Sequence, residues 1–323
     1  MKHVLLGLAA AFMLSACGKD PGPPGGLYDA GGFKLHIYCT GLDHPGPTVI
    51  LEAGLGQLLP MSYWLQSELA RDVRVCSYDR AGTGWSEESG QPHDGEHMAR
   101  QLHAALASAQ IAPPYVLAGH SLGGLVIRVF EKDFSADVSA LAFLDPSHPD
   151  QLERLPKIGP ESSPDSALLI YRVIQYAAAL GLTHIYNPIL AGYEKLDWYA
   201  DYPPEIRASI AALVNASHSY RGVREEIEGF TDTLAQARVA SDFGAKPLIV
   251  ISAGDLPPVP NVTEEQRAAF QAKLAELHEE IAHLSTHGRR VVVPGANHVT
   301  LVDSKSGADR AAAYIVELVR AAP

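Results

Sequence analysis

The sequence predicts an α/β fold in which helices cover both faces of a mostly parallel sheet. Short segments that are almost continuously apolar recur along the chain, as in strands buried on both faces of such a sheet. Segments in which apolar residues recur with helical spacing fall between them, and the connections are short. Residues 146–245 contain helical patterns alone, which predicts a helical insertion between two strands.

The expected strands and helices alternate along most of the chain. The strands comprise residues 33–39, 48–52, 73–78, 115–118, 140–144, 247–252 and 290–293. The helices comprise residues 62–69, 98–110, 122–132, 264–284 and 308–322, and those of the insertion 166–180, 205–215 and 219–239. Tyrosines gather in the first half of the insertion, where we expect most to form its own core and some to wall a pocket.

The overall composition excludes one broad class of partner. The 323 residues are 47% hydrophobic and 19% charged, which suits one large α/β domain with an insertion. The formal net charge is −12, and a protein that binds phosphate backbones needs basic patches. We therefore expect no nucleic-acid partner.

The first sixteen residues resemble a signal peptide rather than part of the fold. A short polar start precedes the apolar residues 4–14, which are too few to span a bilayer as a helix. The sequence Leu14-Ser15-Ala16-Cys17 then resembles the lipobox of bacterial lipoproteins. This resemblance implies that Cys17 is the lipidated first residue of an exported, membrane-anchored protein. A plain secretory signal with a coincidental cysteine is the alternative.

Residues 17–26 are expected to form a tether between the lipid and the fold. They are rich in proline and glycine, which cannot build a core. Gly18, the residue after the cysteine, is not the aspartate associated with inner-membrane retention, which favours the periplasmic face of the outer membrane. The folded core is then expected over residues 27–145 and 246–323.

Cys39 and Cys76 remain after Cys17 is assigned to lipid. Both lie in expected strands, so a disulfide between them is geometrically feasible if the strands are antiparallel neighbours. An oxidising compartment outside the cytoplasm would favour the bridge. Two buried free thiols are the alternative.

Ser121 is the candidate nucleophile. It lies in the sequence Gly-His-Ser-Leu-Gly between an apolar strand, 115–118, and a helical pattern that begins at Leu122. The motif occurs often by chance, so the flanking strand and helix carry the prediction. Such a turn holds the serine hydroxyl at the edge of the sheet, where a helix N-terminus can stabilise an oxyanion.

The base and the acid that Ser121 needs are expected at the ends of later strands. His298 follows the strand 290–293, which places it at the same edge of the sheet as Ser121 and makes it the candidate general base. Asp255 follows the strand 247–252, and the order Ser121, Asp255, His298 is nucleophile, acid and base. We predict Asp255 as the orienting acid. Asp145 leaves the strand before it at the same edge and is the alternative, with a structural role expected.

The second oxyanion donor is expected in the loop after the strand 48–52. This loop is rich in glycine, so its backbone N–H groups can approach a substrate oxygen. We predict that the backbone N–H of Leu55 pairs with that of Leu122 to form the oxyanion hole.

Taken together, these motifs resemble the α/β-hydrolase superfamily. The resemblance rests on Gly-His-Ser-Leu-Gly-Gly at 119–124, Asp-Arg-Ala-Gly-Thr-Gly-Trp-Ser at 79–86, Asp255 at a strand end, and Asn297-His298. It implies a mostly parallel sheet of eight strands with the helical cap inserted after the sixth. It also implies that the strand bearing Cys39 lies antiparallel beside the one bearing Cys76, which favours the disulfide. Glu52-Ala53-Gly54 departs from the family, where many members have His-Gly.

Two histidine patterns are not expected to bind zinc. The pattern from His93 to His97 is interrupted by Gly95, and His278 and His283 are spaced too far apart to share one face of a helix. The second pair is expected on a solvated helix face. We predict no metal site and no cofactor.

The function expected from these residues is hydrolysis through an acyl-enzyme. Ser121 would attack a carbonyl, and the cap suggests an enclosed, partly apolar pocket for an ester of a small or lipid-derived molecule. A peptidase of the proline-iminopeptidase-like type is one alternative. A non-catalytic α/β-hydrolase that binds a ligand is the other.

Overall fold

The computed structural model describes residues 23–158, 164–257 and 261–322, with side chains from residue 167 onward in the second range. The predicted signal peptide, Cys17 and the tether up to residue 22 lie outside the described residues. Eight strands form one sheet in the order β1-β2-β4-β3-β5-β6-β7-β8. The strands are β1 (Gly26–Asp29), β2 (Lys34–Thr40), β3 (Thr48–Glu52), β4 (Val75–Tyr78), β5 (Tyr115–His120), β6 (Val138–Leu144), β7 (Leu248–Ala253) and β8 (Gly288–Val293).

The sheet is parallel from β4 to β8 and antiparallel at its β1 and β2 edge. The predicted fold is therefore confirmed, including the number of strands. β1 was not predicted, because its four residues lie partly in the expected tether and carry little apolar signal. Gly26 pairs with Ile37 of β2, so the fold begins inside the segment assigned to the tether.

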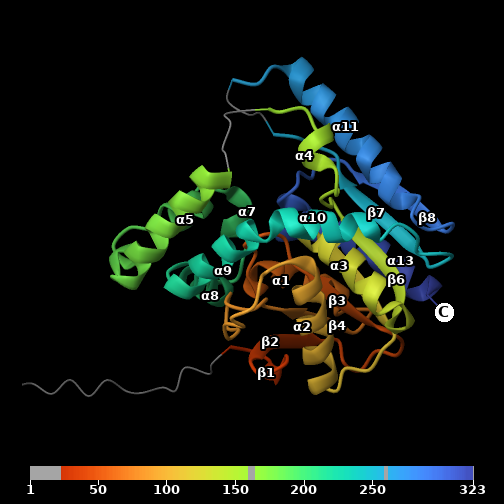
Figure 1. Ribbon diagram of the computed structural model, residues 1–323, viewed down its shortest axis with the longest axis horizontal. Coiled ribbons are helices and arrows are strands. Elements are labelled where there is room, and N and C mark those ends of the chain that lie inside the picture. The colour runs from red at the N-terminus through yellow and green to blue at the C-terminus, as the bar shows by residue number, and fades with distance from the viewer. Residues whose placement is uncertain (1–22, 159–163, 258–260, 323) are drawn as a thin grey trace, which may run out of the picture.

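Two layers of helices cover the faces of the sheet (Figure 1). In β3, Ile50 faces one apolar core while Val49 and Leu51 face the other, as the alternation of side chains along a strand requires. One core is closed mainly by α2 (Gly95–Ser108) and α3 (Leu122–Asp133), and the other by α1 (Tyr63–Leu69) and α13 (Lys305–Ala321). Further helices of the core are η1 (Leu59–Ser62), η2 (Ser135–Asp137), α11 (Glu264–Ala282) and α12 (Thr300–Asp303).

Helices alone occupy the described chain between β6 and β7. They are α4 (Gln151–Arg154), α5 (Pro164–Ala179), η3 (Leu182–His184), α6 (Pro188–Tyr193), α7 (Asp197–Ala200), α8 (Pro204–Val214), α9 (Ser217–Glu228) and α10 (Phe230–Val239). The helix expected over residues 219–239 is two helices that meet at Gly229. A Cβ at Gly229 would lie 2.2 Å from the carbonyl oxygen of His93, so the chain passes too close to the core for any larger residue.

The insertion has its own apolar core, which packs against the residues around η1, just after the loop that follows β3. Tyr199, Tyr202 and Tyr220 are buried in it together with Leu58 and Met61 from around η1. The Tyr202 hydroxyl donates to the Met61 carbonyl oxygen over 2.8 Å. Most tyrosines of the insertion thus pack against one another.

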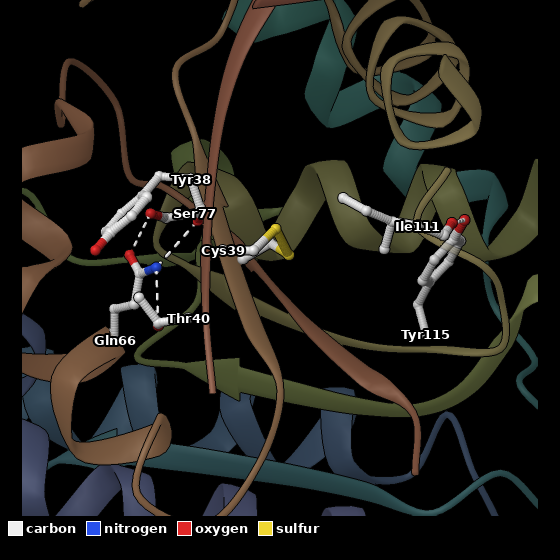
Figure 2. Close-up of a disulfide and its surroundings, with 8 residues drawn as sticks. Tyr38, Cys39, Thr40, Gln66, Ser77, Ile111 and Tyr115 are labelled. Atoms are coloured by element: carbon white, nitrogen blue, oxygen red, sulfur yellow. Dashed lines mark hydrogen bonds between the residues drawn. A yellow bond between two sulfur atoms is a disulfide. The ribbon is translucent and has the colours of Figure 1, made fainter. Parts of the chain in front are cut away.

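A disulfide joins Cys39 of β2 to Cys76 of β4, and the two residues are direct partners in the antiparallel register (Figure 2). Gln66 of α1 ties the same two strands together beside it. Its amide donates to the Tyr38 carbonyl oxygen and its amide oxygen accepts from Ser77. The sequence left open whether Cys39 and Cys76 form a disulfide or remain free thiols, and the structure contains the disulfide.

No single helix in the described ranges is both long and apolar enough to cross a membrane.

Removing the disulfide is expected to lower the free energy of unfolding. The bridge spans a sequence separation of 37 residues, and closing a loop of that length stabilises a fold by about 3–4 kcal/mol. The double substitution Cys39→Ser/Cys76→Ser should therefore lower the urea midpoint, and the slope should rise because the unfolded chain is more expanded without the bridge. Wild type in reducing agent serves as the control, and equal midpoints for oxidised and reduced wild type would contradict the expectation.

Candidate active site

Ser121 lies in the turn between β5 and α3, as predicted. Its backbone has φ 53° and ψ −118°, a positive φ that is uncommon for any residue with a side chain. Glycines on both sides make the turn feasible. A Cβ at Gly119 would lie 2.5 Å from the Gly123 oxygen, and one at Gly123 would lie 2.3 Å from the Glu52 oxygen. The helix can therefore approach the sheet closely and hold Ser121 at its carboxyl edge.

The backbone of Ser121 is held by its neighbours on both sides. Its N–H donates to the Leu144 oxygen at the end of β6 over 3.2 Å. Its carbonyl oxygen accepts from the N–H of Gly124, at 2.9 Å, and of Ser147, at 3.0 Å. These hydrogen bonds stabilise a strained backbone conformation, and they fix the position of the Ser121 Cα from which the side chain extends.

His298 lies in the loop after β8 and forms a hydrogen bond with Asp145. Its Nδ1 is 2.7 Å from Asp145 Oδ2, and the carboxylate is buried whereas half of the histidine side chain is exposed. Asp145 follows β6 directly and has φ 41°, which turns it toward this loop. Its other oxygen accepts from the N–H of Ala253 over 2.9 Å.

The prediction that Asp255 contacts His298 is wrong. The Asp255 carboxylate instead accepts from the backbone N–H of Gly295 over 3.3 Å, and its own N–H donates to the Ala296 oxygen. Asp255 lies two residues past the end of β7, where it reaches the backbone of the histidine loop. Asp145, the alternative, lies at the end of β6 next to the nucleophile strand and reaches the ring.

Asp145 is set up to stay ionised. Burial alone would raise its pKa, but the hydrogen bond and the charge of His298 outweigh burial and hold the pKa below the usual value of an aspartate. His278 supports the same region from α11. Its Nε2 donates to the Pro146 oxygen over 3.0 Å, and its Nδ1 accepts from the Ser252 hydroxyl over 2.8 Å. The expectation of a solvated His278 is wrong, since this ring is buried.

His120 packs against His298. The two ring centroids are 4.7 Å apart, and His120 Nε2 lies 2.9 Å from the His298 carbonyl oxygen. Burial and the neighbouring charge of His298 lower the pKa of His120 to about 3, so its ring is neutral at ordinary pH. Because a carbonyl oxygen only accepts, the proton of the neutral ring is on Nε2. His120 therefore holds the backbone of the histidine loop.

The two predicted oxyanion donors lie at the start of α3 and in the loop after β3. Leu122 is the first residue of α3, and Leu55 lies in the turn after β3. This turn is closed by Gln57, whose side-chain oxygen accepts from the Gly54 N–H over 2.9 Å. Within the described residues, the backbone N–H groups of Leu55 and Leu122 have no protein acceptor.

A buried arginine of the 79–86 motif, Arg80, holds this loop. Arg80 donates to the carbonyl oxygens of Ala53, at 2.8 Å, and Gly54, at 2.6 Å. It also pairs with Glu52 at 2.8 Å and with Glu226 of α9 at 2.8 Å. All three charged side chains are almost completely buried. Glu52, the last residue of β3, is thus a partner of Arg80.

Glu226 reaches the same loop from the insertion. Its Oε2 accepts from the Gly56 N–H over 2.9 Å, while Tyr78 donates to Glu52. Burial raises the pKa of Glu52 although Arg80 opposes it, and burial would lower the pKa of Arg80 but Glu226 and Glu52 raise it. The network therefore links three backbone groups of the oxyanion loop to a helix of the insertion.

Another buried carboxyl, that of Asp303, lies next to this loop. Gln57 donates to Asp303 of α12 over 2.7 Å. Burial raises the pKa of Asp303 to about 8, against a smaller lowering by Gln57.

A pocket of about 320 Å³ opens beside Ser121 and His298. Its polar lining also includes Asp145, Asp255 and Gln271. Its apolar lining comes from around α4 and from α11, through Leu155, Phe270 and Leu274, with Leu256 from the loop after β7. No tyrosine of the insertion in the described residues lines this pocket; Tyr193, Tyr199 and Tyr202 line a separate small cavity next to Asp303. In the described ranges, no cluster of three or more His, Cys, Asp or Glu could hold a metal ion.

The fold and the site define a hydrolase of the nucleophile-elbow type, and comparison with known families agrees. Residues 42–313 match the model of the alpha/beta hydrolase family. The chain belongs to this family.

Solved structures that resemble the chain share its fold over nearly their whole length. Cfl2 of Burkholderia cenocepacia has a TM-score of 0.64 at 20% identity, covering 91% of this chain and 95% of that one. An enol-lactonase of Burkholderia xenovorans has a TM-score of 0.62 at 20% identity, with coverages of 91% and 99%. At such identity the likeness concerns the fold.

Relatives known by sequence match over shorter segments. A protein of Escherichia coli O103:H2 named "Putative carbamate hydrolase RutD" is 38% identical over 98 residues, which are 29% of this chain and 36% of that protein. An uncharacterized protein of Schizosaccharomyces pombe is 27% identical over 206 residues, 54% of this chain and 36% of its own. The chain thus spans little more than a third of either relative.

The raised pKa of Asp303 predicts that stability falls with rising pH. Between about pH 4 and pH 8 the folded state holds a proton that the unfolded state has released. The free energy of unfolding therefore falls as the pH rises through this range. The free energy of unfolding of wild type should fall by at least about 2 kcal/mol between pH 5 and pH 9 relative to that of Asp303→Asn. The difference between the two proteins should change little above pH 8.

Chemical unfolding of both proteins at several pH values measures this difference. Asp309→Asn, at an exposed position of α13, controls for the loss of one carboxylate. Parallel pH profiles for wild type and Asp303→Asn would rule out a buried, protonated Asp303.

Proposed function

We propose that the protein is a serine hydrolase that cleaves a carboxylic ester of a small or lipid-derived molecule through an acyl-enzyme. The observation that carries the proposal is the pairing of His298 with the buried Asp145 at the edge of the pocket that Ser121 also lines. A serine held on a strained turn next to an oriented imidazole is the arrangement that nucleophilic catalysis requires.

In the proposed acylation step, Ser121 Oγ attacks the ester carbonyl carbon. His298 Nε2 takes the hydroxyl proton, and Asp145 accepts the hydrogen bond from Nδ1 and stabilises the imidazolium. The carbonyl oxygen becomes an oxyanion that accepts from the N–H groups of Leu55 and Leu122. When the carbon–oxygen bond to the alcohol breaks, His298 returns the proton to the leaving oxygen.

In the proposed deacylation step, water replaces the alcohol. His298 takes one proton from the water as its oxygen attacks the acyl carbon, and the same oxyanion donors are used again. Collapse of this intermediate releases the carboxylic acid, and the proton returns to Ser121. No cofactor enters either step.

The pocket and the relatives support an ester as the substrate class. Its lining combines apolar side chains, among them Leu155, Phe270 and Leu274, with polar ones outside the Ser-His-Asp group, and its volume lies at the lower end of the range for small-molecule sites. An enol-lactonase and a thermophilic esterase of Thermogutta terrifontis share the fold. Their names, and that of the carbamate hydrolase, describe cleavage next to a carbonyl carbon.

We further propose that the protein is exported and anchored by lipid on Cys17, at the periplasmic face of the outer membrane. The support is the Leu14-Ser15-Ala16-Cys17 motif and the residue Gly18. In this proposal residues 1–16 are removed, 17–25 form the tether, 26–145 and 246–323 form the core, and 146–245 form the cap.

A fluorophosphonate probe tests the proposed nucleophile. Wild type should be labelled on Ser121 and Ser121→Ala should not, because only an activated serine attacks the phosphorus centre. Ester hydrolysis by Ser121→Ala should fall by about 10³-fold or more. Labelling that persists in Ser121→Ala, or none in the wild type, would refute the assignment and favour a ligand-binding module.

The same protein can be tested for substrate class with p-nitrophenyl esters of increasing chain length and with aminoacyl arylamides. We expect turnover of short to medium esters and none of arylamides. The reverse pattern would indicate a peptidase.

Asparagine substitutions at two aspartates separate the two candidate acids. Asp145→Asn should lower kcat by about 10⁴-fold, since the ring of His298 loses the carboxylate that orients it. Asp255→Asn is the matched control, because Asp255 lines the same pocket but forms its hydrogen bonds, within the described residues, with the backbone of Gly295 and Ala296. The Asp255→Asn substitution should lower kcat by less than about tenfold. A larger loss at Asp255 than at Asp145, at equal thermal stability, would reverse the assignment.

A further inference from the structure

Helix α5 (Pro164–Ala179) is apolar on both of its faces. Its inner face packs Tyr171, Ile174 and Ala178 against the core of the insertion. Within residues 167–179 the polar side chains are Arg172 and Gln175 alone. A helix that is apolar all round is normally buried in protein or in lipid.

The outer face of α5 is exposed. Leu169, Ile170, Val173 and Tyr176 have 56–65% of their surface accessible. Their spacing places them along one side of the helix, away from the residues that pack inward. Surface aliphatic residues are ordinary when single, but a continuous group of them is not.

The exposed apolar surface continues beyond the end of α5. Leu180, Leu182, Ile185 and Tyr186 follow in the chain and are 50–84% exposed. We call these four residues and the four outer residues of α5 the α5 edge. In Figure 1 α5 lies at the side of the molecule opposite β8 and the C-terminus.

Charge distinguishes the α5 edge from the rest of the chain. Residues 167–193 contain no acidic residue and one arginine, in a chain with a net charge of −12. The two helical segments in this range, Ala167–Ala179 and Leu182–Tyr193, together meet the length and apolarity of a membrane segment but are bent by 88°. Such a bend suits a hairpin that lies in the interface of a bilayer better than one that spans it.

The start of the described chain lies beside the same insertion. Pro24 lines a small apolar pocket together with Ile206 and Ser209 of α8, and its carbonyl oxygen accepts from His36. Seven residues separate Pro24 from Cys17, a reach of at most about 25 Å. A bilayer that held Cys17 would therefore lie close to the insertion.

We propose that the α5 edge docks on a lipid bilayer, with its aliphatic side chains in the interfacial region. Docking needs no anionic lipid, because the α5 edge carries no charge, Arg172 is the one arginine or lysine in residues 167–193, and the protein as a whole is acidic. The proposal rests on the proposed lipid anchor for its choice of occupant, but its surface is independent of catalysis. Together with the anchor it would hold the protein at two points and so restrict its orientation on the membrane.

Site-specific fluorescence tests the docking. In the full chain, Val173→Cys is labelled with an environment-sensitive dye and mixed with phosphatidylcholine vesicles that do or do not carry brominated acyl chains. The emission maximum of dye at this position should shift to shorter wavelength in the presence of vesicles. Brominated lipid should quench about half of the emission or more, because the dye would lie about 5–10 Å deep in the interface. Unsubstituted protein gives the background from Cys17.

Val239→Cys is the matched control. Val239 lies on α10, outside the α5 edge, and is 70% exposed. Both variants carry the same N-terminus, so anchoring through it affects them equally, and neither readout requires enzyme activity. An added Ile170→Glu should abolish the quenching at position 173.

Equal quenching at positions 173 and 239, or none at 173, would overturn the proposal. A shift at 173 without lipid that grows with protein concentration would also overturn it, since it would show that a second copy of the chain covers this edge. Failure of the esterase proposal would leave these results unchanged.

Discussion

The close approach of helix α3 to strand β3 is the constraint on which the rest of the site depends. Gly119 and Gly123 allow backbone atoms to meet at distances where any Cβ would collide. The turn between β5 and α3 can then be sharp enough to give Ser121 its positive φ and to present the first N–H of α3 beside it. The proposed nucleophile and one proposed oxyanion donor thus depend on one steric condition, and backbone hydrogen bonds between Ser121 and Leu144 and Ser147 keep the turn in place.

A second constraint links the insertion to the chemistry. Arg80 is buried with two glutamates and with two carbonyl oxygens of the oxyanion loop. One glutamate, Glu226, belongs to the insertion and also accepts from Gly56 of that loop. Removing one partner of a buried ion pair leaves an uncompensated charge, which commonly costs about 3–5 kcal/mol. The position of α9 and the shape of the oxyanion loop are therefore coupled by electrostatics rather than by apolar packing alone.

Much of the fold was predictable because its signals are local. Continuous apolar runs mark strands buried on both faces, so the seven predicted strands match β2 to β8 within a few residues. β1 gave no such signal, since four edge residues need not be apolar on both faces. The single helix expected over 219–239 contained no proline. Its break at Gly229 comes from contact with His93 in another part of the chain, which no local pattern reveals.

By itself the sequence determined the nucleophile turn at Ser121, the histidine loop after the last strand, and the family, because glycine spacing and strand ends are written in consecutive residues. Only the tertiary structure decided which carboxylate contacts His298. Asp145 and Asp255 both follow strands at the same edge of the sheet, so chain order could not separate them. The choice depends on how far each lies past its strand and on the φ of 41° at Asp145, which turns its carboxylate toward the histidine. Such distances across neighbouring strands arise when the sheet assembles, because they depend on register and twist rather than on local sequence.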